Sequence, residues 1–137
     1  MKADIVVNQA RGYLGVPFVH QGRSDKGLDC VGLVVRVAHD LGLSKYDFKE
    51  YKSTPNSHTF MEVCRACEDW SRIPITEMKP GDILTISFTS SPCHLAIVAP
   101  GFNIIHALSL RGKVCEHRLS AGWRKKIREC YRFKGVE

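Results

Sequence analysis

The sequence contains no apolar run long enough (about 18 residues or more) to cross a bilayer as a helix. Its N-terminus also lacks the apolar stretch of a secretory signal peptide, because the chain turns polar again at Asn8 and Gln9. A transmembrane helix is therefore excluded. We expect the chain to begin at Met1 and to be made in a cytoplasm.

Internal repeats, linkers and low-complexity tracts are missing as well. The composition, with 44% apolar and 25% charged residues, is ordinary for a globular protein and argues against disorder. The length of 137 residues falls within the usual size of one domain. A chain of this size buries roughly two-thirds of its unfolded surface, so its core needs no metal or disulfide. We expect a single domain over residues 1–137.

Cysteine is plentiful by comparison, with six residues. The six are Cys30, Cys64, Cys67, Cys93, Cys115 and Cys130. An even number suggests three disulfides, but disulfides form mainly in exported proteins. Because no export signal precedes the chain, we expect free thiols.

Net charge is absent from most of the chain. Residues 1–110 carry equal numbers of basic and acidic side chains, so the whole formal charge of +6 lies in residues 111–137. Such a segment suits nucleic acid, an anionic cell envelope, an acidic protein, or simply a solvated strand face. No helix-turn-helix, zinc-finger or RNA-binding signature accompanies it, so we expect no nucleic-acid partner.

Hydrophobic periodicity predicts helices in the first half of the chain and strands in the second. The helices are expected over residues 3–14, 30–41 and 60–70, the second capped by Asp29 and the third by a Thr59–Glu62 capping box. The strands are expected over residues 83–88, 94–99, 103–108, 113–119 and 127–133. This segregation predicts an α+β fold in which the helices pack on an antiparallel sheet.

Cys30 stands at the start of the second helix, where the helix dipole favours the reactive thiolate. The plain alternative is a buried structural cysteine. His94 and His106 fall on consecutive strands, and a turn centred on Pro100 would place them directly opposite each other on one sheet face. A catalytic triad requires a base that a second polar group holds in orientation, and this pair of histidines would supply both. The alternative is that both are ordinary core histidines.

A zinc site is the competing explanation for some of these residues. Cys64-x-x-Cys67 could join Cys93 and His94 as ligands. However, Cys64 and Cys67 lie on the apolar side of the third helix, so core packing is the preferred explanation. We expect no metal and no cofactor. Cys115 and Cys130 are expected to be ordinary sheet residues, and His39, His58 and His117 to lie on the surface, with no partner evident in the sequence.

The sequence resembles a known family, the NlpC-type cell-wall peptidases, which are papain-like cysteine peptidases. The resemblance rests on five motifs in the right order across residues 3–133. They are Gly15-Val16-Pro17-Phe18-Val19-His20-Gln21-Gly22, Asp29-Cys30-Val31-Gly32-Leu33-Val34, Lys79-Pro80-Gly81-Asp82-Ile83, Cys93-His94-Leu95-Ala96-Ile97-Val98, and His106 twelve residues after His94. The resemblance implies a papain-like fold with the nucleophile at a helix N-terminus and a sheet of five to six antiparallel strands.

The resemblance also implies a function. Cys30 would be the nucleophile, His94 the general base and His106 the residue that orients it, in hydrolysis of peptidoglycan stem peptides between D-glutamate and a diamino acid. Asp29, Phe18, Val31 and His20 would line the substrate site, and the last three depart from the family pattern. The short chain is similar to tail-associated peptidases of long-tailed phages, which implies phage tail proteins as partners and delivery in the virion.

Two other functions are compatible with the same residues. The chain could be a weakly active or inactive structural component of a phage tail, against which the intact Cys30, His94 and His106 argue. A papain-like acyltransferase or amidase would use the same thiol and imidazole, because any acyl transfer can do so.

Overall fold

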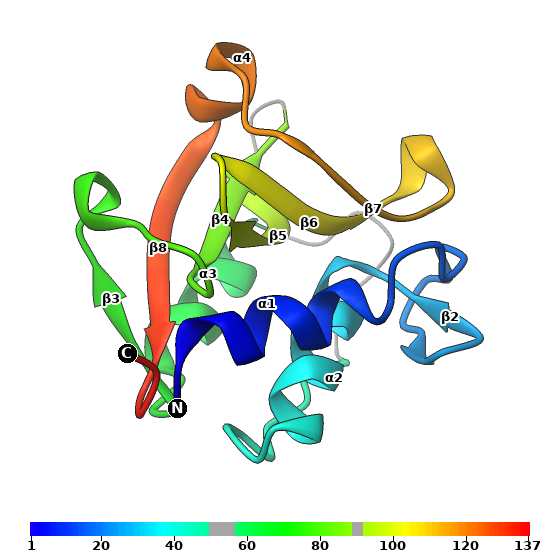
Figure 1. Ribbon diagram of the computed structural model, residues 1–137, viewed down its shortest axis with the longest axis horizontal. Helices are drawn as coiled ribbons and strands as arrows, with labels where there is room; N and C mark the ends of the chain where they lie inside the picture. The colour runs from blue at the N-terminus through cyan, green and yellow to red at the C-terminus, as the bar shows by residue number, and fades with distance from the viewer. Residues whose placement is uncertain (50–56, 89–91) are drawn as a thin grey trace.

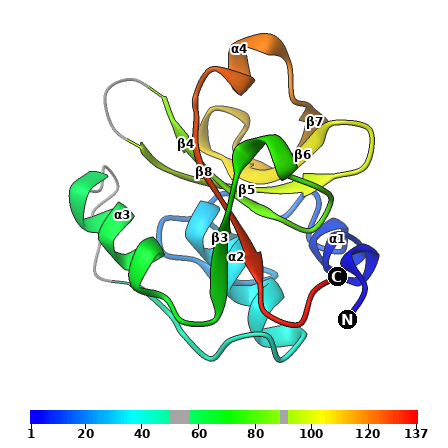
Figure 2. The same cartoon turned by 90° about the vertical axis from the view of Figure 1, so that its left-hand side faces the viewer.

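The computed structural model describes residues 1–49, 57–88 and 92–137, with the side chains of 57–59, 92 and 93 outside that description. Three helices lie on one side of a six-stranded sheet, and a short fourth helix lies on the other side (Figures 1 and 2). The helices are α1 (Ala3–Arg11), α2 (Cys30–Asp40), α3 (Ser57–Ala66) and α4 (Ala121–Arg124), and the 3-10 helices are η1 (Ile75–Glu77) and η2 (Ser109–Arg111). None of the helices in these ranges has the length and apolarity to span a membrane.

The sheet is antiparallel throughout and has the strand order β3-β8-β4-β5-β6-β7. Its strands are β3 (Trp70–Ile73), β4 (Ile83–Ser87), β5 (Pro92–Ala99), β6 (Asn103–Leu108), β7 (Lys113–Arg118) and β8 (Ile127–Phe133), and β1 (Arg23–Ser24) pairs with β2 (Gly27–Leu28) in a separate hairpin. The predicted α+β fold is confirmed. The chain is not a simple meander, because the last strand, β8, lies between β3 and β4.

The third helix differs from the prediction at both ends. It is already helical at Ser57, so Thr59 lies inside the helix rather than at its cap, and it ends at Ala66. Trp70 begins β3 instead. Its ring stacks on Tyr131 with centroids 4.8 Å apart, and its Nε1 donates to the carbonyl of Cys64 at 2.7 Å. The apolar spacing that suggested a longer helix therefore reflects tertiary packing of Trp70 against β8.

Both faces of the sheet are buried, because successive side chains point to opposite faces and consecutive residues of β4 and β6 are buried. On one face Ile83, Leu95 and Ile105 join α1, α2 and α3 in the main core. On the other face Leu84, Ala96 and neighbouring strand residues form a second cluster that Met78 and Trp123 cover. Alternation along β5 and β6 places His94 and His106 on this second face, opposite the face that α1, α2 and α3 cover.

The β5–β6 hairpin corrects the predicted register. Ile97 pairs with Ile105 and Ala99 with Asn103, so the turn is centred on Gly101 rather than Pro100. Gly101 has φ of 79°, a left-handed conformation that glycine adopts without strain. His106 is therefore displaced by two residues from the position directly opposite His94. A shift of two residues preserves the face, so the prediction that both histidines face the same side is correct.

A buried ion pair joins the start of β4 to β8. Asp82 is 0% exposed, and its two carboxylate oxygens accept hydrogen bonds from Nε and Nη2 of Arg132, each at 2.8 Å. The same carboxylate accepts from the backbone N–H of Lys79 at 2.9 Å. This fork explains the Pro80-Gly81-Asp82 motif. It also shows that Arg132, one of the basic C-terminal residues, is structural rather than a solvated charge.

We expect Gly32→Ala to destabilise the protein by about 2 kcal/mol, because overpacking against rigid backbone has costs of that order. A methyl group at Gly32 would lie 2.0 Å from the carbonyl oxygen of Gly22, which holds the preceding loop against α2. Gly122→Ala is the matched control, since a methyl group there meets nothing nearer than Ser120 Oγ at 4.0 Å. Urea unfolding of both variants measures the difference, and equal stabilities would contradict this packing.

Candidate active site

Cys30 is the first residue of α2, as the sequence predicts. Asp29 caps the helix by accepting a hydrogen bond from the backbone N–H of Gly32 at 2.7 Å. Cys30 is half-buried and packs against the main core. The thiol therefore lies at the positive end of the helix dipole, where a thiolate is favoured.

The Asp29 carboxylate also fixes the loop that precedes the helix. It is 3% exposed, and it accepts hydrogen bonds from the backbone N–H of Gln21 at 2.8 Å and from Arg23 Nη1 at 3.2 Å. These contacts fasten the 15–22 loop to the start of α2. Asp29 is thus a structural anchor for Cys30. Its predicted place at the substrate site stays a prediction.

The other residues expected at the substrate site lie in three different environments. Val31 is only 6% exposed and lines an apolar cavity of about 60 Å³ between α2, α3 and β5. Phe18 is half-buried against the core, and His20 is exposed. Of the three, Phe18 and His20 therefore present surface beside the start of α2, whereas the Val31 side chain belongs to the core.

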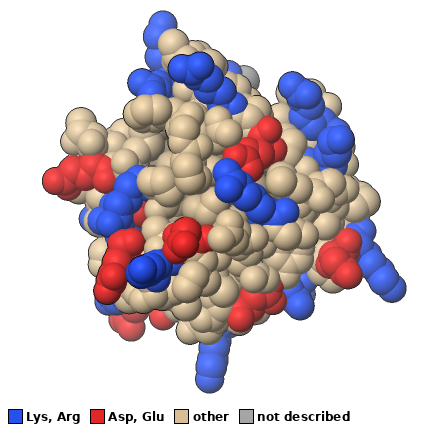
Figure 3. Space-filling model, in the orientation of Figure 1, with Lys and Arg blue, Asp and Glu red and all other residues tan. Residues whose placement is uncertain are grey.

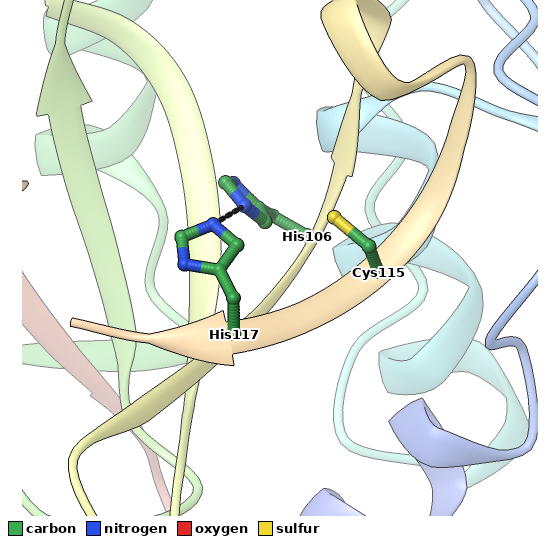
Figure 4. A group of neighbouring side chains, drawn as sticks. All are labelled: His106, Cys115 and His117. Atoms are coloured by element: carbon green, nitrogen blue, oxygen red, sulfur yellow. Dashed lines mark hydrogen bonds between the residues drawn. The ribbon is translucent and has the colours of Figure 1, made fainter.

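Three histidines form a hydrogen-bonded chain on the second face of the sheet. His94 Nε2 lies 2.6 Å from His106 Nδ1. His106 Nε2 lies 2.8 Å from His117 Nε2, the contact drawn as a dashed line in Figure 4. His117 Nδ1 lies 2.9 Å from the carbonyl oxygen of Arg118. The prediction that His117 is a surface residue without a partner is wrong. The missed signal is the alternation along β7, which places Cys115 and His117 on one face.

The carbonyl of Arg118 determines where the protons of this chain lie when all three rings are neutral. A carbonyl only accepts, so His117 Nδ1 carries a proton and His117 Nε2 accepts from His106 Nε2. His106 Nδ1 then accepts from His94 Nε2. His94 is left with a lone pair on Nδ1, which is the nitrogen that a general base needs for a thiol proton.

Burial keeps His94 and His106 neutral. They are 4% and 0% exposed, respectively. Phe88 packs on the His94 ring at 4.8 Å, and Trp123 of α4 packs on the His106 ring at 5.2 Å. Burial, followed by the neighbouring His117, lowers the pKa of His106 to about 3. Burial, followed by His106 and His117, holds the pKa of His94 well below its usual range.

Cys30 and His94 lie on elements that pack together, because helix α2 packs against β5 and β6. His94 is in turn joined to His106 by the 2.6 Å contact between their rings. The described residues thus place the His94 imidazole and a helix-terminal thiol on adjoining elements.

The alternative zinc site around Cys64 is not supported by its surroundings. Cys64 is 4% exposed and lines the apolar cavity, and burial raises the pKa of its thiol to about 12. Cys67 also faces this cavity. Cys64 is thus a core residue, and Cys67 is half-buried beside it at the apolar cavity. The side chains of Cys93 and His58 lie outside the described residues.

We expect acid to destabilise the protein through His106. Between about pH 6.5, where an unfolded histidine titrates, and about pH 3, where folded His106 does, the unfolded chain binds the extra proton. The free energy of unfolding therefore falls as pH falls through this window, by up to about 1.4 kcal/mol per pH unit per proton. His106→Asn should flatten the slope measured by urea unfolding, whereas His39→Asn, at an exposed histidine, should not. Identical slopes for His106→Asn and the native protein would contradict burial of a neutral His106.

Comparison with solved structures identifies the fold. The NlpC/P60 domain of the peptidoglycan hydrolase SagA is 22% identical, with a TM-score of 0.66, over 95% of this chain and 97% of that one. An NlpC/P60 family protein from Bacillus cereus is 20% identical, with a TM-score of 0.71, over 96% of this chain and 40% of that one. The peptidoglycan hydrolase RipB from Mycobacterium tuberculosis is 17% identical, with a TM-score of 0.67, over 95% of this chain and 63% of that one.

Likeness at this level of identity shows the fold, and the chain spans well under two-thirds of the Bacillus cereus protein. No curated protein is significantly similar to this chain. The sequence pattern of the NlpC/P60 family, however, matches residues 15–132, a range that holds Cys30 and the three hydrogen-bonded histidines His94, His106 and His117. The protein therefore belongs to the NlpC/P60 family.

Proposed function

We propose that the protein is a thiol-dependent peptidase that hydrolyses peptidoglycan stem peptides. The observation that carries the proposal is the hydrogen bond between His94 Nε2 and His106 Nδ1, because it orients His94 as a base. Cys30 is the nucleophile, His94 the general base and His106 the residue that orients the base. The SagA domain and RipB, both described as peptidoglycan hydrolases, support the substrate class.

The residues can carry both halves of an acyl transfer. His94 Nδ1 takes the thiol proton, and the Cys30 thiolate attacks the carbonyl carbon of the scissile peptide bond. The tetrahedral intermediate collapses when His94 gives its proton to the leaving amine, which leaves a thioester on Cys30. Water, activated by His94, then attacks the thioester, releases the carboxylate product and restores the thiol. His106 accepts from His94 Nε2 throughout and stabilises the imidazolium.

The surface charge fits an anionic substrate such as the cell wall. Figure 3 shows lysine and arginine side chains gathered over α4 and over the η2 turn. Arg111 and Lys113 belong to the turn region, and Arg124 and Lys125 to α4 and its end. Exposed charges of one sign attract an oppositely charged surface over about 8 Å at physiological salt. This patch supports an insoluble wall as the partner.

The finer parts of the proposal concern the bond and the route of delivery. The resemblance of the Cys30 and His94 motifs favours the bond between D-glutamate and a diamino acid. Mass spectrometry of products from purified peptidoglycan identifies the bond, since an amidase would instead release whole stems from the sugar. Release of whole stems, or acyl transfer without hydrolysis, would overturn the peptidase assignment. Delivery by a phage tail is a separate proposal, which a search for this chain in purified virions tests.

We expect Cys30→Ala to abolish release of stem-peptide fragments while the far-UV circular dichroism spectrum stays unchanged. Cys67→Ala, at a half-buried cysteine that lines the apolar cavity, is the matched control and should retain activity. Iodoacetamide at neutral pH should modify Cys30 faster than Cys67, because burial raises the pKa of the Cys67 thiol. Full activity of Cys30→Ala would remove Cys30 from the mechanism.

The two central histidines should respond differently to substitution. His94→Ala should lower kcat/KM by at least ~10³-fold, as loss of a triad member does. His106→Asn should retain part of the activity, because an amide oxygen can still accept from His94 Nε2. Steady-state kinetics on a soluble stem peptide measures both variants. Equal losses would show that His106 does more than orient His94.

A further inference from the structure

A second chemical feature lies at the outer end of the histidine chain. His106 on β6 is paired directly with Cys115 on β7, and His117 is paired with Ile104 on the same two strands. Residues two apart on a strand share a face, so His106, Cys115 and His117 converge. One ligand atom from each, two imidazole nitrogens and a sulfur, all lie within 4.8 Å of one another. Figure 4 shows the Cys115 sulfur on the same side of the strands as both imidazoles.

This set of donor atoms is one that zinc prefers. Zn²⁺ binds imidazole nitrogen at about 2.0–2.1 Å and thiolate sulfur at about 2.3 Å, and three protein ligands leave a fourth position for water. Tetrahedral geometry with these bond lengths places two nitrogens about 3.3 Å apart. His106 Nε2 and His117 Nε2 are 2.8 Å apart, and the three ligand atoms lie within 4.8 Å of one another. Binding therefore requires the two rings to separate slightly and the Cys115 sulfur to move toward them, since a tetrahedral site places nitrogen and sulfur about 3.6 Å apart.

The surroundings of both imidazoles also match a metal site. A histidine that binds zinc usually donates its other ring N–H to a fixed acceptor, which sets its orientation. His117 Nδ1 contacts the carbonyl of Arg118 at 2.9 Å, and His106 Nδ1 contacts His94 Nε2 at 2.6 Å. Cys115 and His117 are half-buried on β7, the edge strand, which gives an ion access to the site.

We propose that His106 Nε2, His117 Nε2 and Cys115 Sγ form a three-ligand site for Zn²⁺, and that a bound ion inhibits the peptidase. From the sequence alone we expect no metal and an ordinary sheet residue at Cys115, so this site departs from both expectations. The site itself is independent of the catalytic assignment. The inhibition rests on the proposed function of Cys30 and His94.

The inhibition follows from the positions of the protons. Binding of Zn²⁺ displaces the proton of Cys115, and the ion takes the lone pair of His106 Nε2. Neutral His106 then carries its proton on Nδ1, which donates to His94 Nε2. His94 must hold its own proton on Nδ1 and can no longer take one from the thiol there. The imidazolium form of His94 is also disfavoured, because its Nε2–H would meet the Nδ1–H of His106.

Binding is tested first without reference to activity. The protein is stripped of metal, and Zn²⁺ affinity is measured by competition with a chromophoric chelator, with Co²⁺ as a spectroscopic probe. We expect one ion per chain and a sulfur-to-cobalt charge-transfer band. Cys115→Ser should abolish the band and weaken Zn²⁺ binding at least about tenfold. Cys67→Ser, outside the cluster, and Cys30→Ala, which removes the nucleophile, should leave both unchanged.

The activity arm separates the two proposals. The ratio of activity with and without Zn²⁺ is measured within each variant, so any change in basal rate cancels. We expect strong inhibition of the native enzyme and of Cys67→Ser, and markedly less of Cys115→Ser. Binding that is unaffected by Cys115→Ser, or lost in Cys30→Ala, would overturn the zinc site. Stoichiometric binding with unchanged activity would overturn the inhibition, and binding by a chain with no peptidase activity would overturn the proposed function alone.

Discussion

The arrangement of the site depends on one buried carboxylate, that of Asp29. Its oxygens accept from the backbone N–H groups of Gly32 and Gln21 and from Arg23, so it ends the loop and begins α2 at a single point. Cys30 takes its position and its helix-dipole environment from this cap. Loss of the carboxylate would release the loop and remove the acceptor of the Gly32 and Gln21 backbone N–H groups. This loss is costly because Asp29 is only 3% exposed, which leaves little room for water as a replacement.

The second half of the site depends on burial rather than on charge. The faces of β5 and β6 that bear His94 and His106 are covered by Phe88 and Trp123, and the rings satisfy one another through hydrogen bonds. A protonated imidazole is disfavoured there, so the rings are neutral and each has one donor and one acceptor nitrogen. The tautomer of one ring therefore fixes the tautomer of the next through the hydrogen bond between them. The direction of that preference is set at its far end, by the Arg118 carbonyl.

A zinc ion and the His106 proton would compete for the same nitrogen, Nε2. His106 Nδ1 can orient His94 for proton transfer only while its Nε2 carries a proton for His117. A metal ion on Nε2 removes that proton and reverses the hydrogen bond to His94. The proposed catalysis and the proposed zinc binding therefore require opposite proton positions on one ring. This is how a site at the edge strand would influence a residue two strands away, through the hydrogen bond between His106 and His94.

The sequence by itself determined the elements and the chemistry that they carry. Helical and alternating periodicity located α1, α2 and five of the six sheet strands, and Asp29 marked the cap of α2. The alternation of side chains along β5 and β6 predicted that His94 and His106 share one face of the sheet. These features depend on residues close together in the chain. The tertiary structure alone decided the register around Gly101, the transfer of Trp70 from helix to strand, and the partnership of His117 with His106. Each of these three features depends on which strand, distant in sequence, packs against the residue. The distance between two rings decides whether they form a hydrogen bond, and the local sequence pattern does not specify that distance.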